Sequence, residues 1–423
     1  MTDLESRARK DYERAREVFA ELGVDTDRAL KALEGVSLSL PCWQADDVGG
    51  FEGREGGPGG GLQVTGSRPG RPRNPEELRA DLSKALSLVP GRHRVNLHAM
   101  YGEFGKGADR DRIAPEHFQG WVDWARSAGA GLDFNATCFA HPKAEAGFTL
   151  ASPDEGIRSF WVEHVRRARE VGAWMGRELG ETCLHNLWIP DGTKDLTTLR
   201  FRSRERLFES LDRIYAERFD PGELRDSVES KLFGIGTEAF TAGSHEFYLL
   251  YAMERGIFPC LDTGHFHPTE SVADKVSSLL LFFPELLLHL SRGIRWDSDH
   301  VVILEDALEE TACEAVRAGA LDRIHWALDF FDAGLNRVGA LVLGARAVQK
   351  ALLSALLEPV EKMREREEEG DRFGLLALRE SWKELPSGAV WRYFCLEKGV
   401  PFGEALAEEV ETYEREVLLK REG

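Results

Sequence analysis

The feature of this sequence that most restricts its fold is the alternation of short apolar runs with longer segments of helical periodicity. Continuous apolar strands separated by helices are typical of parallel strands that are buried on both faces. The apolar runs lie at residues 36–41, 95–100, 132–137, 183–189, 228–235, 257–262, 286–290 with 295–297, and 324–331. Segments with helical spacing lie between most of them, for example 75–88, 115–128, 157–179 and 199–218.

Eight such strand–helix units in about 300 residues predict an α/β fold, a (β/α)₈ TIM barrel. The competing arrangement is an open, doubly wound sheet, which needs a topological switch point and usually a phosphate-binding loop. The sequence contains neither GxGxxG nor GxxxxGK[ST]. The barrel is therefore the favoured architecture.

Helical segments extend the expected barrel at both ends. Apolar residues at helical spacing from Tyr12 to Leu22 predict an N-terminal helix, and a second helix is expected at 26–33. After residue 345 the pattern is helical throughout. We expect residues 1–345 to form the barrel with its N-terminal helices, and residues 346–423 to form a C-terminal helical extension that provides subunit contacts.

Two segments allow two interpretations each. The glycine-rich stretch 49–66 fits a flexible linker, but it follows the first expected strand, where a barrel carries a loop over its active-site face. We expect it to be a lid. The apolar stripe Leu406, Val410, Tyr413 and Val417 fits either packing against the barrel or contact with another subunit.

Charge and cysteine usage exclude several classes of protein. The 423 residues carry a formal net charge of −19 without a basic cluster, which argues against nucleic acid and anionic membranes as partners. The six cysteines are scattered, with no CxxC pair, so we expect reduced, buried thiols in a cytoplasmic protein. The N-terminus lacks a signal-peptide core, and no apolar run is long enough to cross a membrane.

Acidic and histidine residues gather at the ends of the last four expected strands. Charged groups in buried strands are costly unless they are paired or coordinated, and the strand ends of a barrel converge on one pocket. Carboxylates and imidazoles without cysteine favour Mn²⁺, Mg²⁺ or Co²⁺ over a structural zinc. The residues are Glu229, Lys231, Asp262, His265, His267, His289, Asp297, Asp299, His300, Asp329 and Asp332.

Each of these residues also has an ordinary structural explanation. His289 alone could be a hydrogen-bonded core histidine, Asp297 and Asp299 could cap a helix, and Lys231 could be solvated. The spacing of Asp297 and Asp299 places both carboxylates on one face of an extended segment, as a shared metal requires. At the earlier strand ends, Trp43, His98, Phe134 and Trp188 are candidates for the wall of a sugar pocket, or for core packing.

Several motifs resemble those of the L-rhamnose isomerase family, in family order from about residue 5 to the end. They are PCWQADDVGGFE, NLHAMY, GLDFNATCFAHPK, NLWIPDGTKD, VESKLFGIG, CLDTGHFHPTE, RWDSDHVV and LDFFDAGLNR. The resemblance implies a homotetramer whose subunits each bind two divalent metal ions, typically Mn²⁺, with Mg²⁺, Co²⁺ or Zn²⁺ as alternatives. It also implies that the substrate is a small sugar.

The resemblance assigns roles to residues of this sequence. Glu229, Asp262, His289 and Asp329 would hold a structural metal, and His265, Asp297 and Asp299 a catalytic one, with Asp262 near both. Trp43, His98, Trp188 and Lys231 would contact the sugar, and Phe134 stays a candidate for the same wall. Lys231, His265, Asp297, Asp299 and Asp329 would take part in catalysis.

The implied reaction interconverts L-rhamnose and L-rhamnulose, and related aldoses are compatible side substrates. A metal Lewis acid would polarise the sugar, Lys231 would stabilise charge at O1, and the hydrogen would cross as a hydride. A cis-enediol route through a carboxylate base is the alternative. Competing functions are a sugar epimerase or an isomerase with another preferred sugar on the same barrel, a metal-dependent phosphodiesterase, and a non-catalytic sugar-binding protein.

Overall fold

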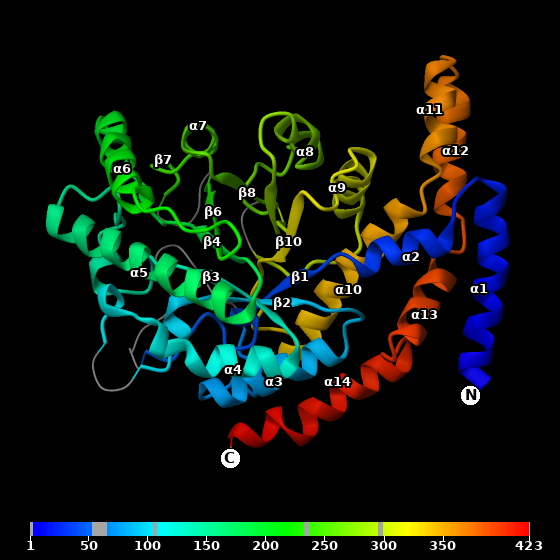
Figure 1. Cartoon of the computed structure of the whole chain (residues 1–423), viewed down its shortest axis with the longest axis horizontal. Coiled ribbons are helices and arrows are strands. Elements are labelled where there is room, and N and C mark those ends of the chain that lie inside the picture. Colours follow the sequence, from blue (N-terminus) through cyan, green and yellow to red (C-terminus); the bar gives the residue numbers. More distant parts are fainter. Residues whose placement is uncertain (1–2, 53–65, 105–107, 232–236, 295–298, 423) are drawn as a thin grey trace.

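The computed structural model describes residues 3–52, 66–104, 108–231, 237–294 and 299–422. Within these residues, eight parallel strands form one sheet in the hydrogen-bonded order β3-β2-β1-β10-β9-β8-β6-β4, which curls into a barrel (Figure 1). The strands are β1 (Leu38–Pro41), β2 (Arg94–His98), β3 (Gly131–Asn135), β4 (Cys183–Leu187), β6 (Leu224–Glu229), β8 (Phe258–Asp262), β9 (Leu286–Leu290) and β10 (Ile324–Leu328). The predicted TIM barrel is confirmed.

The first and last strands of this order, β3 and β4, are joined by side chains. Asp133 Oδ1 accepts a hydrogen bond from the backbone N–H of Leu184 at 2.9 Å, and Asn135 Oδ1 accepts one from Asn186 N–H at 3.3 Å. Backbone N–H groups of β4 are thus satisfied at this seam, where a regular ladder would otherwise supply carbonyls.

Helices surround the sheet, because the outward side of most strands is apolar. On β9 the residues Leu286, Leu288 and Leu290 pack into the large outer core, whereas Leu287 belongs to a small interior cluster. This is the alternation expected of a strand. The surrounding helices are α3 (Pro75–Ser87), α4 (Gln119–Ala128), α5 (Glu155–Leu179), α6 (Arg200–Tyr215), α7 (His245–Arg255), α8 (Ala273–Leu280), α9 (Asp306–Arg317) and α10 (Arg337–Leu356). A two-stranded antiparallel sheet pairs β5 (Gly192–Thr193) with β7 (Phe240–Thr241).

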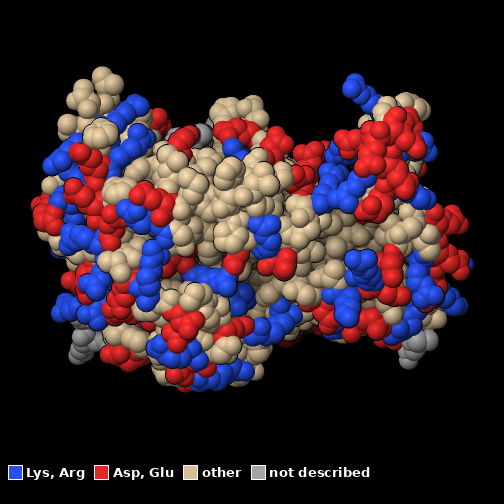
Figure 2. Space-filling model, turned by 45° about the horizontal axis from the view of Figure 1, so that its top comes forward, with Lys and Arg blue, Asp and Glu red and all other residues tan. Residues whose placement is uncertain are grey.

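The predicted terminal helices are present and lie side by side (Figure 1). N-terminal α1 (Asp3–Glu21) packs on α13 (Ser387–Glu397), where the rings of Tyr12 and Tyr393 stack with centroids 3.8 Å apart. The other helices outside the barrel are α2 (Thr26–Glu34), α11 (Val360–Glu368), α12 (Arg372–Lys383) and α14 (Glu404–Glu416). On the face shown in Figure 2, basic and acidic residues are interspersed, and acidic ones gather over the α11 region.

Helix α10 links the barrel to the C-terminal extension. The expected boundary between residues 345 and 346 falls inside this helix. It is long and apolar enough to cross a membrane by composition, but 83% of that window is buried in the protein, as in a core helix of a barrel. The apolar stripe of α14 also packs inside the chain, because Leu406 is buried and Val410 contacts the core.

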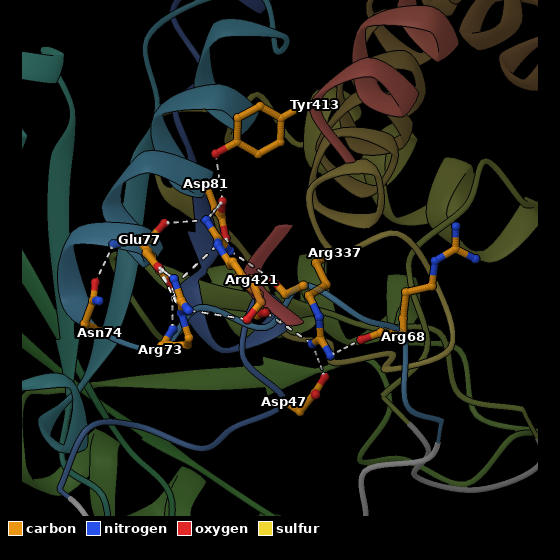
Figure 3. Close-up of polar contacts among 11 residues, drawn as sticks. Asp47, Arg68, Arg73, Asn74, Glu77, Asp81, Arg337, Tyr413 and Arg421 are labelled. Carbon is orange, nitrogen blue, oxygen red and sulfur yellow. Dashed lines mark hydrogen bonds and ion pairs between the residues drawn. The ribbon is translucent and has the colours of Figure 1, made fainter. Parts of the chain in front are cut away.

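A C-terminal clasp fastens α14 and the final residues to α3, and we define it by Asp81, Tyr413 and Arg421 (Figure 3). The Arg421 guanidinium donates to both oxygens of Asp81 at 2.7 and 2.8 Å, and the Tyr413 hydroxyl donates to Asp81 Oδ1 at 2.8 Å. Arg421 also donates to the Gly70 carbonyl at 2.8 Å. The C-terminus is therefore tied to the segment that leads from β1 to α3.

Arg337 at the start of α10 holds both described ends of the β1–α3 connection. Its Nη1 donates to Asp47 Oδ1 at 2.5 Å, and its Nη2 donates to the Arg68 carbonyl (Figure 3). The expected lid at 49–66 lies largely outside the described residues, which stop at residue 52 and resume at residue 66.

One strand differs from its sequence prediction. The sequence predicts a strand over 228–235, but β6 begins at Leu224 and ends at Glu229. A search for apolar runs misses the first half of β6, because it contains polar residues. These residues have hydrogen-bond partners in the folded chain: Asp226 pairs with Arg169 of α5 at 2.9 Å, and the Ser227 hydroxyl donates to Asn186 Oδ1 at 2.8 Å.

Candidate active site

Four acidic and imidazole side chains meet at the carboxyl ends of neighbouring strands. Glu229 ends β6, Asp262 ends β8, His289 lies near the end of β9, and Asp329 follows β10. One ligand atom from each lies within 4.8 Å of the others. Parallel strands place these ends on one side of the barrel, where such enzymes carry their active sites. The structure therefore brings together the four residues that the family resemblance assigned to one metal.

The hydrogen bonding of this cluster fits a cation. Among the described residues, Asp262 Oδ2 and both ring nitrogens of His289 are buried and have no hydrogen-bond partner. His289 Nδ1 nevertheless lies 3.0 Å from Glu229 Oε2 and 3.0 Å from Asp329 Oδ2. Buried carboxylate oxygens and imidazole nitrogens that lie this close together without hydrogen bonds destabilise the folded chain unless a cation or a proton lies between them.

The pKa values of the cluster reflect crowded charge. Burial, together with the negative charges of Glu229 and Asp329, raises the pKa of Asp262 to about 7. Burial opposes a charge on His289, yet Cys260 and the cluster carboxylates hold its pKa well above the usual range. A divalent cation would neutralise the same carboxylates and would compete with that proton for the imidazole.

Two further predicted metal ligands border the cluster. His265 Nδ1 lies 3.1 Å from Glu229 Oε1 and 2.9 Å from the Ser230 carbonyl. Asp299 lines the same pocket and has a backbone φ of 41°, in the left-handed region that few non-glycine residues adopt. Asp297 lies outside the described residues.

Aromatic side chains line the same pocket as the cluster and form a wall beside it. The rings of Trp43 and His98 lie 4.8 Å apart, His98 and Phe139 5.4 Å, and Phe139 and Trp188 5.9 Å, each pair edge to face. The loss of hydration among these rings lowers the pKa of His98 to about 3, so its imidazole stays neutral. Trp43, His98 and Trp188 therefore lie where the sequence places them, at the mouth of the barrel.

Lys231 completes the polar side of the pocket. Its ammonium lies 4.9 Å from the centroid of the Trp188 ring, and its side chain is almost fully buried. A cation over an aromatic face is held electrostatically by the ring. Lys231 thereby points a positive charge into the same cavity as the acidic cluster.

The structure does not bring Phe134 to the pocket. Its ring is fully buried in the outer core and packs edge to face on Phe118, with centroids 4.8 Å apart. The following residue, Asn135, lines the pocket instead. Successive residues of a strand face opposite sides of the sheet. An assignment that is wrong by one residue therefore selects a side chain in the outer core instead of one in the pocket.

Sequence reasoning missed two amides in the site, Asn135 and Asn186. Asn186 Nδ2 donates to Glu229 Oε2, and its own Oδ1 accepts the Ser227 hydroxyl, so the amide orients the carboxylate. The available signal was an asparagine inside each of two apolar strands, FNATCF and HNLWIP. Partners of this kind commonly fix the orientation of metal ligands.

The barrel and this set of donors are those of an enzyme with a site suited to divalent cations, beside a pocket with an aromatic wall. The model of the L-rhamnose isomerase family (RhaA) matches residues 6–421. The L-rhamnose isomerase of Bacteroides thetaiotaomicron is 53% identical over 418 residues and is covered, like this chain, to 99%.

Two more relatives agree. The L-rhamnose isomerases of Salmonella gallinarum and Rhodopirellula baltica are each 52% identical over 97% of this chain and over 98% and 96% of their own lengths. The chain belongs to the L-rhamnose isomerase family and is an isomerase. Among solved structures, an L-ribulose 3-epimerase superposes with a TM-score of 0.44 and 12% identity, over 78% of this chain and 97% of that one.

Proposed function

We propose that this chain interconverts L-rhamnose and L-rhamnulose with two bound divalent cations, Mn²⁺ in the first place. The observation that carries the proposal is the convergence of Glu229, Asp262, His289 and Asp329 beside a pocket with an aromatic wall, in a chain that is 53% identical to an L-rhamnose isomerase. Related aldoses are expected as slower substrates.

The residues divide into two ligand sets in this proposal. Glu229, Asp262, His289 and Asp329 would hold one cation, and His265 and Asp299 the other, with Asp297 added on the motif RWDSDH alone. The bound cations would act as Lewis acids on the first two oxygens of the sugar. Asn186 and Trp43 orient two of the carboxylates, since they donate hydrogen bonds to Glu229 and Asp329.

The side chains of the pocket supply the remaining chemistry. As the C2 hydrogen moves to C1 as a hydride, the C2–O2 bond becomes a carbonyl and the O2 proton passes to O1. Asp299 and Asp329 line the pocket and can carry the proton from O2 to O1. Lys231 lines the same pocket and stabilises negative charge at O1. The neutral imidazole of His98 is left to hydrogen-bond a sugar hydroxyl.

A pair of histidine variants tests the proposal. His265→Ala removes a proposed ligand, whereas His267→Ala, two residues further on, changes an exposed side chain that bonds only locally to Thr269. We expect His265→Ala to abolish L-rhamnulose formation and His267→Ala to retain it, with products analysed by chromatography. Equal activity of the two variants, or a C3 epimer as the product, would contradict the proposal.

The route of the hydrogen has its own test. The reaction is run in D₂O, and the label in the L-rhamnulose is measured by mass spectrometry. A hydride shift predicts that almost no solvent deuterium enters a carbon position. Substantial uptake at C1 indicates the cis-enediol route, with one of the pocket carboxylates as the base.

A cytoplasmic homotetramer is part of the proposal. All six cysteines are free and buried, which suits a reducing compartment. In the single chain, large apolar side chains remain exposed, among them Leu281 (82%) and Phe373 (81%), the latter on α12 of the C-terminal extension. On α12, Phe373 and Leu376 (58%), one helical turn apart, are both exposed, and neighbouring exposed apolar residues commonly mark subunit contacts. Light scattering should give four times the chain mass, and Phe373→Asp should shift it toward smaller species.

A further inference from the structure

Cys260 brings a thiol into the interior of the barrel next to the acidic cluster. It lies on β8 two residues before Asp262, so the alternation of the strand points both side chains inward. It packs with Leu184, Phe258 and Leu287 in the small interior cluster and is 2% exposed. The sequence pattern predicts a metal site without cysteine, whereas the folded chain places one beside it.

The thiol forms a second donor set with two residues of the first. One ligand atom each from Glu229, Cys260 and His289 lies within 4.8 Å of the other two, and all three residues are buried. The thiol donates to Glu229 Oε2 at 3.7 Å, and His289 Nδ1 lies 3.0 Å from the same oxygen. Glu229 and His289 are thus common to both sets, and sulfur takes the place of Asp262 and Asp329.

The buried imidazole of His289 is available to both donor sets. His289 is 1% exposed, and in the part of the chain that the structure describes neither of its ring nitrogens has a hydrogen-bond partner. A histidine held in this way is available to a cation approaching from either donor set.

We propose that Glu229, Cys260 and His289 form a second cation position that selects thiophilic divalent cations such as Cd²⁺ and Zn²⁺. Thiolate is a soft ligand, whereas the oxygen-rich set with Asp262 and Asp329 suits harder cations such as Mn²⁺. Because both positions use Glu229 and His289, one cation excludes the other. The thiol must lose its proton to ligate, so each cation bound there releases one proton.

The test follows two cations in the full-length, Mn²⁺-loaded protein and needs no sugar turnover. Cd²⁺ is titrated in, the thiolate-to-Cd²⁺ charge-transfer absorption is recorded in the ultraviolet, and released Mn²⁺ is measured by electron paramagnetic resonance. We expect one thiolate–Cd²⁺ band per chain, growing as one Mn²⁺ is released.

Three variants separate the two donor sets. Cys260→Ser should lose the band, keep Mn²⁺, and weaken Cd²⁺ binding by more than the roughly 10- to 100-fold that follows from loss of an outer-shell partner. Asp262→Asn should do the reverse, weakening Mn²⁺ and keeping the band. Cys395→Ser removes a buried thiol on distant α13 and should behave as the unchanged chain.

The outcomes that overturn the inference are the absence of a band in the unchanged chain and a band that survives Cys260→Ser. X-ray absorption of the Cd²⁺-loaded, unchanged chain gives a reading that does not depend on how a variant folds: one sulfur neighbour supports the site, and only oxygen and nitrogen neighbours refute it. A chain that shows the thiolate–Cd²⁺ band but binds no Mn²⁺ would contradict the proposed metal centre and still support this second cation position.

Discussion

The indole N–H of Trp43 donates a hydrogen bond to Asp329 Oδ1 at 3.1 Å and so joins the loop after β1 to the loop after β10. The two residues are 286 positions apart in the chain and meet only because β1 pairs with β10 in the barrel. Trp43 is thus both part of the aromatic wall and the residue that orients a proposed metal ligand.

Trp43→Phe keeps an aromatic ring and removes the donor. We expect Mn²⁺ affinity to fall by roughly 10- to 100-fold, the usual effect of losing a group that orients a ligand. Trp124→Phe is the matched control, because the indole of Trp124 donates only to Ser83 on the surface. Mn²⁺ titration followed by electron paramagnetic resonance measures both. Unchanged affinity in Trp43→Phe would remove its orienting role.

Removal of the ion pair between Arg421 and Asp81 in the C-terminal clasp should strongly lower the stability of the protein. Arg421→Met leaves the fully buried carboxylate of Asp81 without its cation, which should lower the free energy of unfolding by about 3–5 kcal/mol. Arg415→Met on the exposed side of α14 should cost less than about 0.5 kcal/mol. Urea unfolding gives both values, and a similar small loss for the two would contradict the clasp.

Phe134 and Asn135 should show opposite effects on stability and on substrate binding. Phe134→Ala opens a cavity in the outer core and should cost about 3–5 kcal/mol of unfolding free energy. Asn135→Ala changes the pocket and should raise KM with a smaller effect on stability. If KM rises only in Phe134→Ala, the original assignment of Phe134 to the sugar pocket would be restored.

Buried His164 should make the protein less stable in acid. Burial and the nearby Arg110 charge lower its pKa to about 3, and its two nitrogens already bond Thr137 N–H and the Arg110 carbonyl. The unfolded chain takes up a proton near pH 6.5 that the folded chain refuses, so this contribution is complete above pH 6.5 and is lost as the pH falls toward 3.

The comparison with His164→Gln isolates this effect. Between pH 6.5 and 4.5 the unchanged chain should lose roughly 2.5 kcal/mol more unfolding free energy than the variant, at about 1.4 kcal/mol per pH unit. Urea unfolding in the presence of a chelator removes the contribution of metal binding. Above pH 7 the difference between the two proteins should be constant. Parallel curves down to pH 4.5 would show that His164 titrates alike in both states.

The architecture could be predicted because most strands of the barrel contain a continuous run of apolar residues. β9, with the sequence LLLHL, is visible in this way, and so are the helices that cover it. β6 was placed too late because LRDSVE satisfies its polar groups through Arg169 and Asn186, which come from other elements. An apolar pattern carries no information about such partners.

The metal cluster could be predicted from motifs, but its surroundings could not. Glu229, Asp262, His289 and Asp329 lie at or next to the carboxyl ends of neighbouring strands, and topology alone brings them together. The place of Cys260 beside the cluster was not predicted. Whether a strand residue points into the barrel depends on the exact register of the strand, because successive side chains face opposite sides. The pair Arg421–Asp81 joins positions 340 apart, and only the folded chain defines it.

The proposed function requires that the cluster of Glu229, Asp262, His289 and Asp329 hold a metal ion that the isomerase reaction needs. The most direct measurement incubates metal-stripped protein with L-rhamnose, with and without added Mn²⁺, and separates the products by chromatography. We expect L-rhamnulose only when Mn²⁺ is present. Equal conversion without metal, or no conversion by a folded and Mn²⁺-loaded sample, would contradict it.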